Sequence, residues 1–140
     1  MSSTVETLDA ARAWVDAWQR GWSHHDPEVI ATRYAAGCRF QSQPFRPMGS
    51  GPEAVATYAR ASFAEEREAR FVFGDPIAGE GGRAAVEYRA VVIDPGGEPS
   101  TLHGVSVLRF DGDGLVAEHR DCWTMIDGDR GLEPLQEATS

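Results

Sequence analysis

The chain has 140 residues, a length that favours a single compact domain with a buried core. Thirteen Lys and Arg residues against 22 Asp and Glu residues give a net charge of −9, which argues against nucleic acid or an anionic membrane as the partner. Two cysteines are too few for a disulfide framework, and no apolar run approaches the ~18 residues of a membrane span. Because no secretory signal is recognisable at the amino terminus, we expect a soluble, cytoplasmic protein.

An apolar stripe predicts a helix near the amino terminus. Ser3 and Glu6 have the spacing of a capping box at its start. The apolar residues that follow recur at steps of three and four, so they lie on one face of a helix. These residues are Leu8, Ala11, Val15, Trp18 and Trp22.

A short second helix is predicted after the first. Asp26 is suited to cap it, and Pro27 is suited to its first turn. Ile30 and Tyr34 are four residues apart and are expected on this helix, and Gly37 is expected to end it in a left-handed conformation. The run CRFQSQPF that follows predicts a strand.

The rest of the chain predicts a third helix and then a sheet. Ser50 and Glu53 have capping-box spacing, and the helix is expected to extend to near Arg70. From there, β-branched and aromatic runs alternate with glycine-rich turns, and four strands are predicted at about 71–77, 83–93, 100–110 and 115–126. This order indicates one α+β domain over residues 1–140, in which an antiparallel sheet curls around helices on one face. Residues 127–140 are predicted to form a loose polar tail.

The turn between the last two predicted strands allows their facing residues to be predicted. If Phe110 lies opposite Leu115, residues directly opposite share a face. One face is then apolar at its lower end, and Gly104 opposite Asp121 leaves room for a ligand. The same face carries a small polar group that consists of Ser106, His119 and Asp121.

The pairing of the preceding hairpin is a weaker prediction. If Ile93 lies opposite Ser100, Glu87 falls near His119 and Arg89 falls near Asp121. The apolar set on that strand would then point away from the pocket, and a slip by one residue would exchange the two faces. That set is Val86, Tyr88, Ala90 and Val92.

The predicted pocket contains candidates for acid–base catalysis. Asp121 is the leading candidate for a general acid or base, because an apolar wall would keep its carboxyl group partly dehydrated. His119 is predicted to share a proton with it, and Arg89 to lie beside it. The alternative for Asp121 is an ion pair with Arg89 or Arg120 that satisfies a buried charge, and the alternative for His119 is a structural hydrogen bond.

Aromatic and polar residues are predicted to line a pocket for a ring-containing ligand, although core packing explains any single aromatic residue as well. The predicted substrate-binding residues are Trp18, Trp22, Tyr34, Phe40, Tyr58, Glu87, Ser106 and Trp123. No metal site is expected, since His24 and His25 lack a closing carboxylate and DGDG lacks further calcium ligands. No cofactor is expected either, since phosphate-binding glycine motifs are missing from the sequence.

Several segments resemble the SnoaL-like branch of the nuclear transport factor 2-like superfamily. They are the opening AWVDAWQRGWSHHDPE, the hairpin GVSVLRFDGDGLV and the closing EHRDCW, and the resemblance covers nearly the whole chain. It implies a cone-shaped α+β barrel around a pocket, and homodimers are common in the family. We also expect a homodimer because Val105, Val107 and Val116 form a stripe on the second face of the predicted hairpin.

The resemblance implies that steroid isomerisation is not the function. The positions of the isomerases' oxyanion-hole acid, base carboxylate and tyrosine hold Ser106, Ser42 and Trp18. The segment HRDCW is similar to a final-strand segment of limonene-epoxide-hydrolase relatives, in which Asp121 would match a catalytic carboxylate. Their Arg-x-Asp element has only Glu87-x-Arg89, in reversed order, as a counterpart.

These observations predict a cofactor-independent acid–base enzyme that acts on a small hydrophobic, ring-containing metabolite. Cyclisation, dehydration, isomerisation and epoxide opening all fit this class. The alternative is a non-catalytic ligand-binding or dimerisation module of the same fold, because the isomerase residues are missing.

Overall fold

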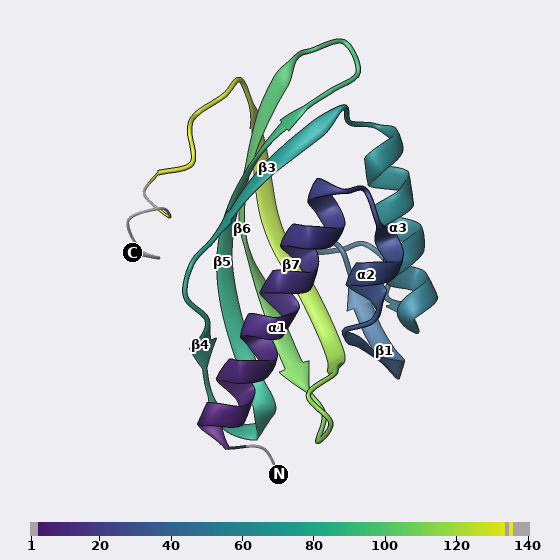
Figure 1. Cartoon of the computed structure of the whole chain (residues 1–140), viewed down its shortest axis with the longest axis vertical. Helices are drawn as coiled ribbons and strands as arrows, with labels where there is room; N and C mark the ends of the chain where they lie inside the picture. The colour runs from purple at the N-terminus through teal and green to yellow at the C-terminus, as the bar shows by residue number, and fades with distance from the viewer. Residues whose placement is uncertain (1–2, 134, 136–140) are drawn as a thin grey trace.

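Three helices pack against one face of a curved seven-stranded sheet in the computed structural model, which describes residues 3–133 and residue 135 (Figure 1). The helices are α1 (Thr4–Ser23), α2 (Pro27–Ala31) and α3 (Pro52–Ala64). The strands are β1 (Tyr34–Gln41), β2 (Gly49–Ser50), β3 (Glu68–Phe73), β4 (Ile77–Ala78), β5 (Arg83–Ile93), β6 (Pro99–Phe110) and β7 (Val116–Asp127). The predicted α+β class is confirmed. None of the described helices has the length and apolarity needed to cross a membrane.

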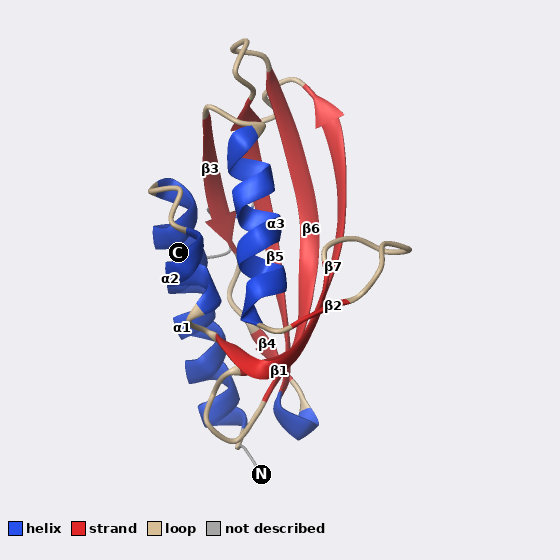
Figure 2. Ribbon diagram, turned by 90° about the vertical axis from the view of Figure 1, so that its right-hand side faces the viewer, coloured by secondary structure: helices blue, strands red, loops and turns tan. Residues whose placement is uncertain are grey.

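The sheet is mixed, whereas the sequence predicted an antiparallel one. Its strand order is β2-β1-β7-β6-β5-β3, with β4 paired to β5, and β1 runs parallel to β7. Figure 2 shows β1 bending across one end of the sheet, where it joins β2.

Helix α1 begins as predicted. The Ser3 hydroxyl accepts a hydrogen bond from the Glu6 amide (3.1 Å), and the Glu6 carboxylate accepts one from the Ser3 amide (3.0 Å). The buried face is rotated slightly from the predicted stripe, so Trp14 is buried while Leu8 and Val15 lie at its margin. Three tryptophans of this helix therefore point toward the sheet, at positions 14, 18 and 22.

The predicted second helix is too long. Asp26 caps α2 as expected, since its carboxylate accepts from the amides of Glu28 and Val29. The helix ends at Ala31, however, and Tyr34 begins β1 opposite Val116 of β7. Gly37 consequently lies inside a strand and ends no helix. The four-residue spacing of Ile30 and Tyr34 fits a longer helix, but it does not require one. The pairing of Tyr34 with the sheet decides in favour of the strand.

The predicted limits of the third helix are also wrong. Gly51, with φ of +80°, precedes α3, and no side chain caps the helix. Ser50 pairs with Arg39 between β2 and β1, so it does not act as the predicted cap. The helix ends at Ala64 rather than near Arg70, because Glu68–Phe73 form β3 against β5.

The predicted face of the β6–β7 hairpin is confirmed, but the residue pairs differ. Ser106 lies opposite Asp121 and Leu108 opposite His119, a shift of two residues that leaves these four side chains on their predicted side. An irregularity between Arg109 and Phe110 then places Val116 opposite Phe110, where it is fully buried. The predicted outer valine stripe therefore loses Val116.

The weaker prediction, for the β5–β6 pairing, is wrong by one residue. Ile93 lies opposite Pro99 across a five-residue loop, which places Tyr88 opposite Gly104 and Val86 opposite Ser106. The set predicted to point away from the pocket faces it instead. Glu87 and Arg89 lie on the outer face of the sheet for the same reason, since a slip of one residue exchanges the faces of a strand.

The chain after β7 crosses the outer face of the sheet, on the side away from the helices (Figure 1). The Arg89 guanidinium donates hydrogen bonds to the carbonyls of Gly131 (3.3 Å) and Glu133 (2.6 Å). The Thr101 hydroxyl donates to the Gly128 carbonyl (2.7 Å). Residues 134 and 136–140 of the predicted loose tail lie outside the described residues.

Gly104 is required for close packing of β6 on β7. A Cβ atom there would lie 2.5 Å from the Cys122 carbonyl oxygen and 2.6 Å from the Trp123 Cβ atom. The space that the sequence analysis assigned to a ligand is therefore occupied by Trp123.

We expect Gly104→Ala to lower the free energy of unfolding by ~1–3 kcal/mol, because the two strands must separate to admit the methyl group. Urea denaturation followed by circular dichroism measures this. Gly112→Ala is the matched control, since nothing in the described chain lies within 4 Å of its added Cβ atom. Equal stability of both variants would contradict the packing argument.

Candidate functional site

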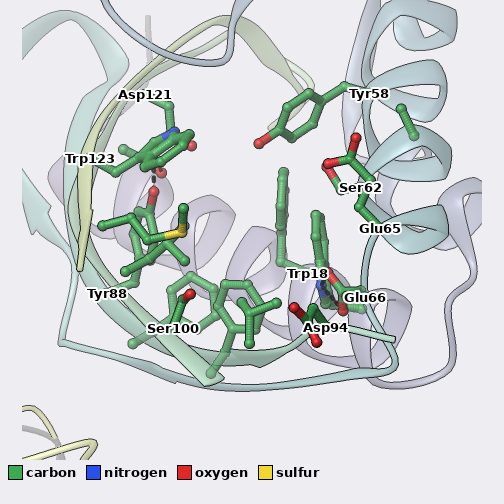
Figure 3. Close-up of a pocket in the computed structure, with 18 of the residues that line it drawn as sticks. Trp18, Tyr58, Ser62, Glu65, Glu66, Tyr88, Asp94, Ser100, Asp121 and Trp123 are labelled. Atoms are coloured by element: carbon green, nitrogen blue, oxygen red, sulfur yellow. Dashed lines mark hydrogen bonds between the residues drawn. The ribbon is translucent and has the colours of Figure 1, made fainter. Parts of the chain in front are cut away.

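A cavity of about 510 Å³ lies between the helices and the inner face of the sheet (Figure 3). Its walls come from α1, α3 and strands β3, β5, β6 and β7. All four tryptophans of the chain line it, together with Tyr58, Tyr88, Phe71 and Phe73. This volume falls in the range of small-molecule sites, and the wall is mostly apolar, as in such sites.

Asp121 on β7 is the central polar group of the sheet wall. Its side chain is buried, and its Oδ1 atom accepts hydrogen bonds from the Ser106 hydroxyl (2.8 Å) and the Tyr88 hydroxyl (3.3 Å). The three residues meet because β5, β6 and β7 are neighbours with these positions in register. Burial raises the pKa of Tyr88, and the nearby Asp121 raises it further, so the phenol keeps its proton and acts as a donor.

His119 lies deeper in the core than Asp121, away from the cavity. It is fully buried, and its Nε2 atom lies 3.8 Å from the Oδ2 atom of Asp121. Its Nδ1 atom lies 2.8 Å from the Tyr34 hydroxyl, and Phe40 packs against its ring. Within the described structure, His119, Tyr34 and Phe40 do not line the cavity. Asp121 and His119 are thus neighbours, as predicted, but only the carboxylate of Asp121 reaches the cavity.

Glu66 is a second carboxylate of the cavity, and sequence reasoning missed it. It follows α3, and Figure 3 places it across the cavity from Asp121. Both of its oxygens accept from the Trp22 indole NH (3.1 and 3.0 Å), and His25 Nε2 lies 3.4 Å away. Burial raises the pKa of Glu66, while the Trp22 and His25 contacts partly oppose the increase. Nothing in the run AEEREAR distinguishes this glutamate from the exposed Glu65.

Trp18, Trp22, Tyr58, Ser106 and Trp123 line the cavity, as the sequence predicted. Burial also raises the pKa of the Tyr58 hydroxyl, which retains its proton. The binding roles of these residues remain predictions, because position alone does not establish a role.

Glu87 and Arg89 lie away from the cavity because of the β5–β6 register. Their neighbour there is His103, whose Nε2 atom lies 2.6 Å from the Glu87 carboxylate and whose Nδ1 atom accepts from Arg89 (3.1 Å). This outer cluster replaces the predicted contacts of Arg89 with Asp121 and of Glu87 with His119. We therefore leave both residues out of the proposed site.

Charged side chains also line the cavity, and one of them packs on Trp123. The Arg46 guanidinium lies 5.5 Å from the Trp123 ring centroid and donates to the Ser42 hydroxyl (3.0 Å). The Trp123 indole donates to the Ser42 carbonyl (2.7 Å), which fixes the orientation of the ring. Glu65, Asp94 and Glu98 also line the cavity. In the described part of the chain, no three His, Cys, Asp or Glu side chains converge as a metal site requires.

We expect the stability of the protein to depend on pH through Glu66. Its folded-state pKa is raised above the ordinary 4.5, so its contribution is fully present below that value and is lost as pH rises through the raised pKa. The side chain in Glu66→Gln cannot ionise. The free energy of unfolding of this variant, measured relative to the wild type, should therefore be higher at pH 8 than at pH 4.5. Urea unfolding at both values tests this, with the exposed neighbour substitution Glu65→Gln as control. An identical Glu66→Gln difference at the two pH values would argue against the assignment.

Comparisons with known proteins agree with this architecture. No curated protein matches the sequence. The chain is similar in structure to SalBIII, an epoxide hydrolase/cyclase-like enzyme with a role in pyran ring formation in the polyether salinomycin. The two chains are 18% identical and superimpose with a TM-score of 0.73, over 88% of this chain and 99% of that one. It is also similar to Rv0760c from Mycobacterium tuberculosis, at 19% identity and a TM-score of 0.72, over 91% and 100% of the two chains. The model of the SnoaL-like domain matches residues 11–119, and the protein therefore belongs to the SnoaL-like family.

Proposed function

We propose that this protein is a cofactor-independent acid–base enzyme that acts on a small hydrophobic, ring-containing metabolite. The observation that carries the proposal is the pair of buried carboxyl groups, Asp121 and Glu66, on facing walls of one aromatic cavity. Two carboxyl groups in different environments are the usual basis for separate acid and base roles. The aromatic residues of the wall supply an apolar surface for the substrate.

The surroundings of the two carboxyl groups favour different roles. Asp121 accepts two hydroxyl hydrogen bonds on Oδ1, which orient its carboxyl group and leave Oδ2 free to act as a base. Burial raises the pKa of Glu66 and so favours its protonated form, which suits a general acid. Tyr88 and Ser106 orient the base through their hydroxyl groups and transfer no proton in the reaction.

Epoxide opening illustrates how this arrangement would operate. Asp121 accepts a proton from water while the water oxygen attacks a ring carbon of the epoxide. The carbon–oxygen bond of the ring breaks, and Glu66 gives its proton to the released oxygen, which yields a diol. A hydroxyl group of the substrate in place of water yields a cyclic ether by the same proton transfers. Solvent then returns the proton from Asp121 to Glu66.

The similarity to SalBIII supports the choice of epoxides and epoxy alcohols as test substrates, since that protein is described as epoxide hydrolase/cyclase-like. The alternative function is ligand binding without chemistry. It is favoured by the serines at positions 42 and 106 and by Trp18, which stand where isomerase relatives are expected to have catalytic groups. Conversion of any bound compound, detected by mass spectrometry, separates the two functions.

Binding and turnover are tested first with 1-methylcyclohexene oxide and a γ,δ-epoxy alcohol. All four tryptophans line the cavity, so intrinsic tryptophan fluorescence reports binding there. We expect Asp121→Asn to lower turnover of the accepted substrate by roughly 10²–10⁴-fold, the contribution of a positioned proton transfer. Product is measured by gas chromatography with mass spectrometry.

Glu118→Gln is the matched control, because Glu118 lies on the same strand as Asp121 but on its outer face. It should retain the wild-type rate. A folded Asp121→Asn protein with full turnover would show that Asp121 is not the base.

We also propose a homodimer in which outer sheet faces pair. Val105 and Val107 lie on the outer face of β6 and are partly exposed, which supports this arrangement even though Val116 is buried inside. Light scattering at micromolar concentration should give twice the mass of one chain. A monomeric mass would contradict the proposal.

A further inference from the structure

The Tyr34 hydroxyl is surrounded by three nitrogen atoms in the core. It accepts hydrogen bonds from the indole NH groups of Trp14 (3.0 Å) and Trp18 (3.1 Å), and it lies 2.8 Å from His119 Nδ1. An indole nitrogen can only donate, and a phenol oxygen has two lone pairs. The two tryptophans therefore use both acceptor sites of Tyr34.

This arrangement leaves one direction for the contact between Tyr34 and His119. The hydroxyl proton of Tyr34 must be donated to His119 Nδ1, because the oxygen has no lone pair left to accept from it. Burial raises the pKa of Tyr34 well above its ordinary value, so the phenol retains the proton that it donates. Nδ1 is then the bare nitrogen of a neutral imidazole, and the ring hydrogen is on Nε2.

The Nε2 atom faces the carboxylate proposed as the base. It is fully buried without a hydrogen-bond partner, and it lies 3.8 Å from Asp121 Oδ2, the oxygen that Ser106 and Tyr88 leave free. Contacts that become catalytic hydrogen bonds are often long without substrate and shorten when it binds. A buried NH group without an acceptor is costly, so contraction toward Oδ2 would be favourable.

We propose that Tyr34 holds His119 in the Nε2–H tautomer, and that His119 is a positioning residue that donates to Asp121 and transfers no proton. A second ring proton, on Nδ1, would point at a hydroxyl whose lone pairs are both occupied. The one negative charge beside the imidazole is Asp121, and it faces Nε2, which carries a hydrogen in either form of the ring. The side chains that pack on the ring, Trp14, Trp18 and Phe40, carry no charge. The link to Asp121 rests on the proposed function, whereas the tautomer does not.

Nitrogen NMR of the full chain labelled with ¹⁵N-histidine tests the tautomer without any substrate. The chain has four histidines, and the His119 signals are those missing from the His119→Gln spectrum. Near neutral pH we expect His119 to show a bare Nδ1 and a protonated Nε2. A protonated Nδ1, alone or together with Nε2, would overturn the inference.

Tyr34→Phe tests whether Tyr34 is responsible. Loss of the hydroxyl should move the Nδ1 resonance and populate the second tautomer, because that nitrogen loses its donor. Tyr58→Phe removes the hydroxyl of a tyrosine that lines the cavity, whereas the hydroxyl bound to His119 Nδ1 is that of Tyr34, so this variant should leave the resonance in place. An unchanged Nδ1 resonance in Tyr34→Phe would overturn the role of Tyr34. If this variant does not fold, the wild-type spectrum still decides the tautomer.

His119→Gln tests the positioning role, since a glutamine amide is also a neutral donor. On a substrate turned over by the wild type, we expect a loss of less than about tenfold, the effect of weakening one hydrogen bond. A loss of roughly 10²–10⁴-fold would mean that His119 itself transfers a proton. If no substrate is turned over, the proposed enzyme function fails, and the NMR result decides the tautomer independently.

Discussion

The pairing of β6 with β5 on one side and with β7 on the other places every polar group of the sheet wall. Tyr88, Ser106 and Asp121 come from three strands, and they meet because these strands lie side by side with their inner faces in phase. A change of one residue in either register would send one of these side chains to the outer face. Gly104 permits the close approach of β7 that this arrangement needs.

Helix α1 complements the sheet by placing indole rings against this wall. Trp14 and Trp18 reach the Tyr34 hydroxyl, and Trp22 reaches Glu66 on the other side of the cavity. The indole NH groups thus donate to both Tyr34 and Glu66, while the rings pack in the space between these residues. Asp121 and Glu66 each accept hydrogen bonds from donors in distant parts of the chain, which is how a mostly apolar cavity accommodates two carboxyl groups.

Local patterns predicted the parts of the fold that depend on neighbouring residues. The capping box at Ser3 and the cap at Asp26 involve contacts within three positions. The last three long strands were recognised from the alternation along each strand and from the short turns that join them. Errors arose where a distant partner competed with the local pattern. Tyr34 and Ser50 were predicted to belong to helices, and both pair in the sheet instead.

The sequence by itself determined the α+β class and the inward direction of Ser106, His119 and Asp121, because alternation along a strand assigns faces even when the pairing is shifted by two residues. The tertiary structure alone decided that Tyr88 replaces Arg89 beside Asp121, since a slip of one residue in the β5–β6 pairing exchanges faces. It also brought Glu66 to Trp22 across 44 positions. No spacing rule connects residues so far apart, and only packing of the helices on the curved sheet makes them neighbours.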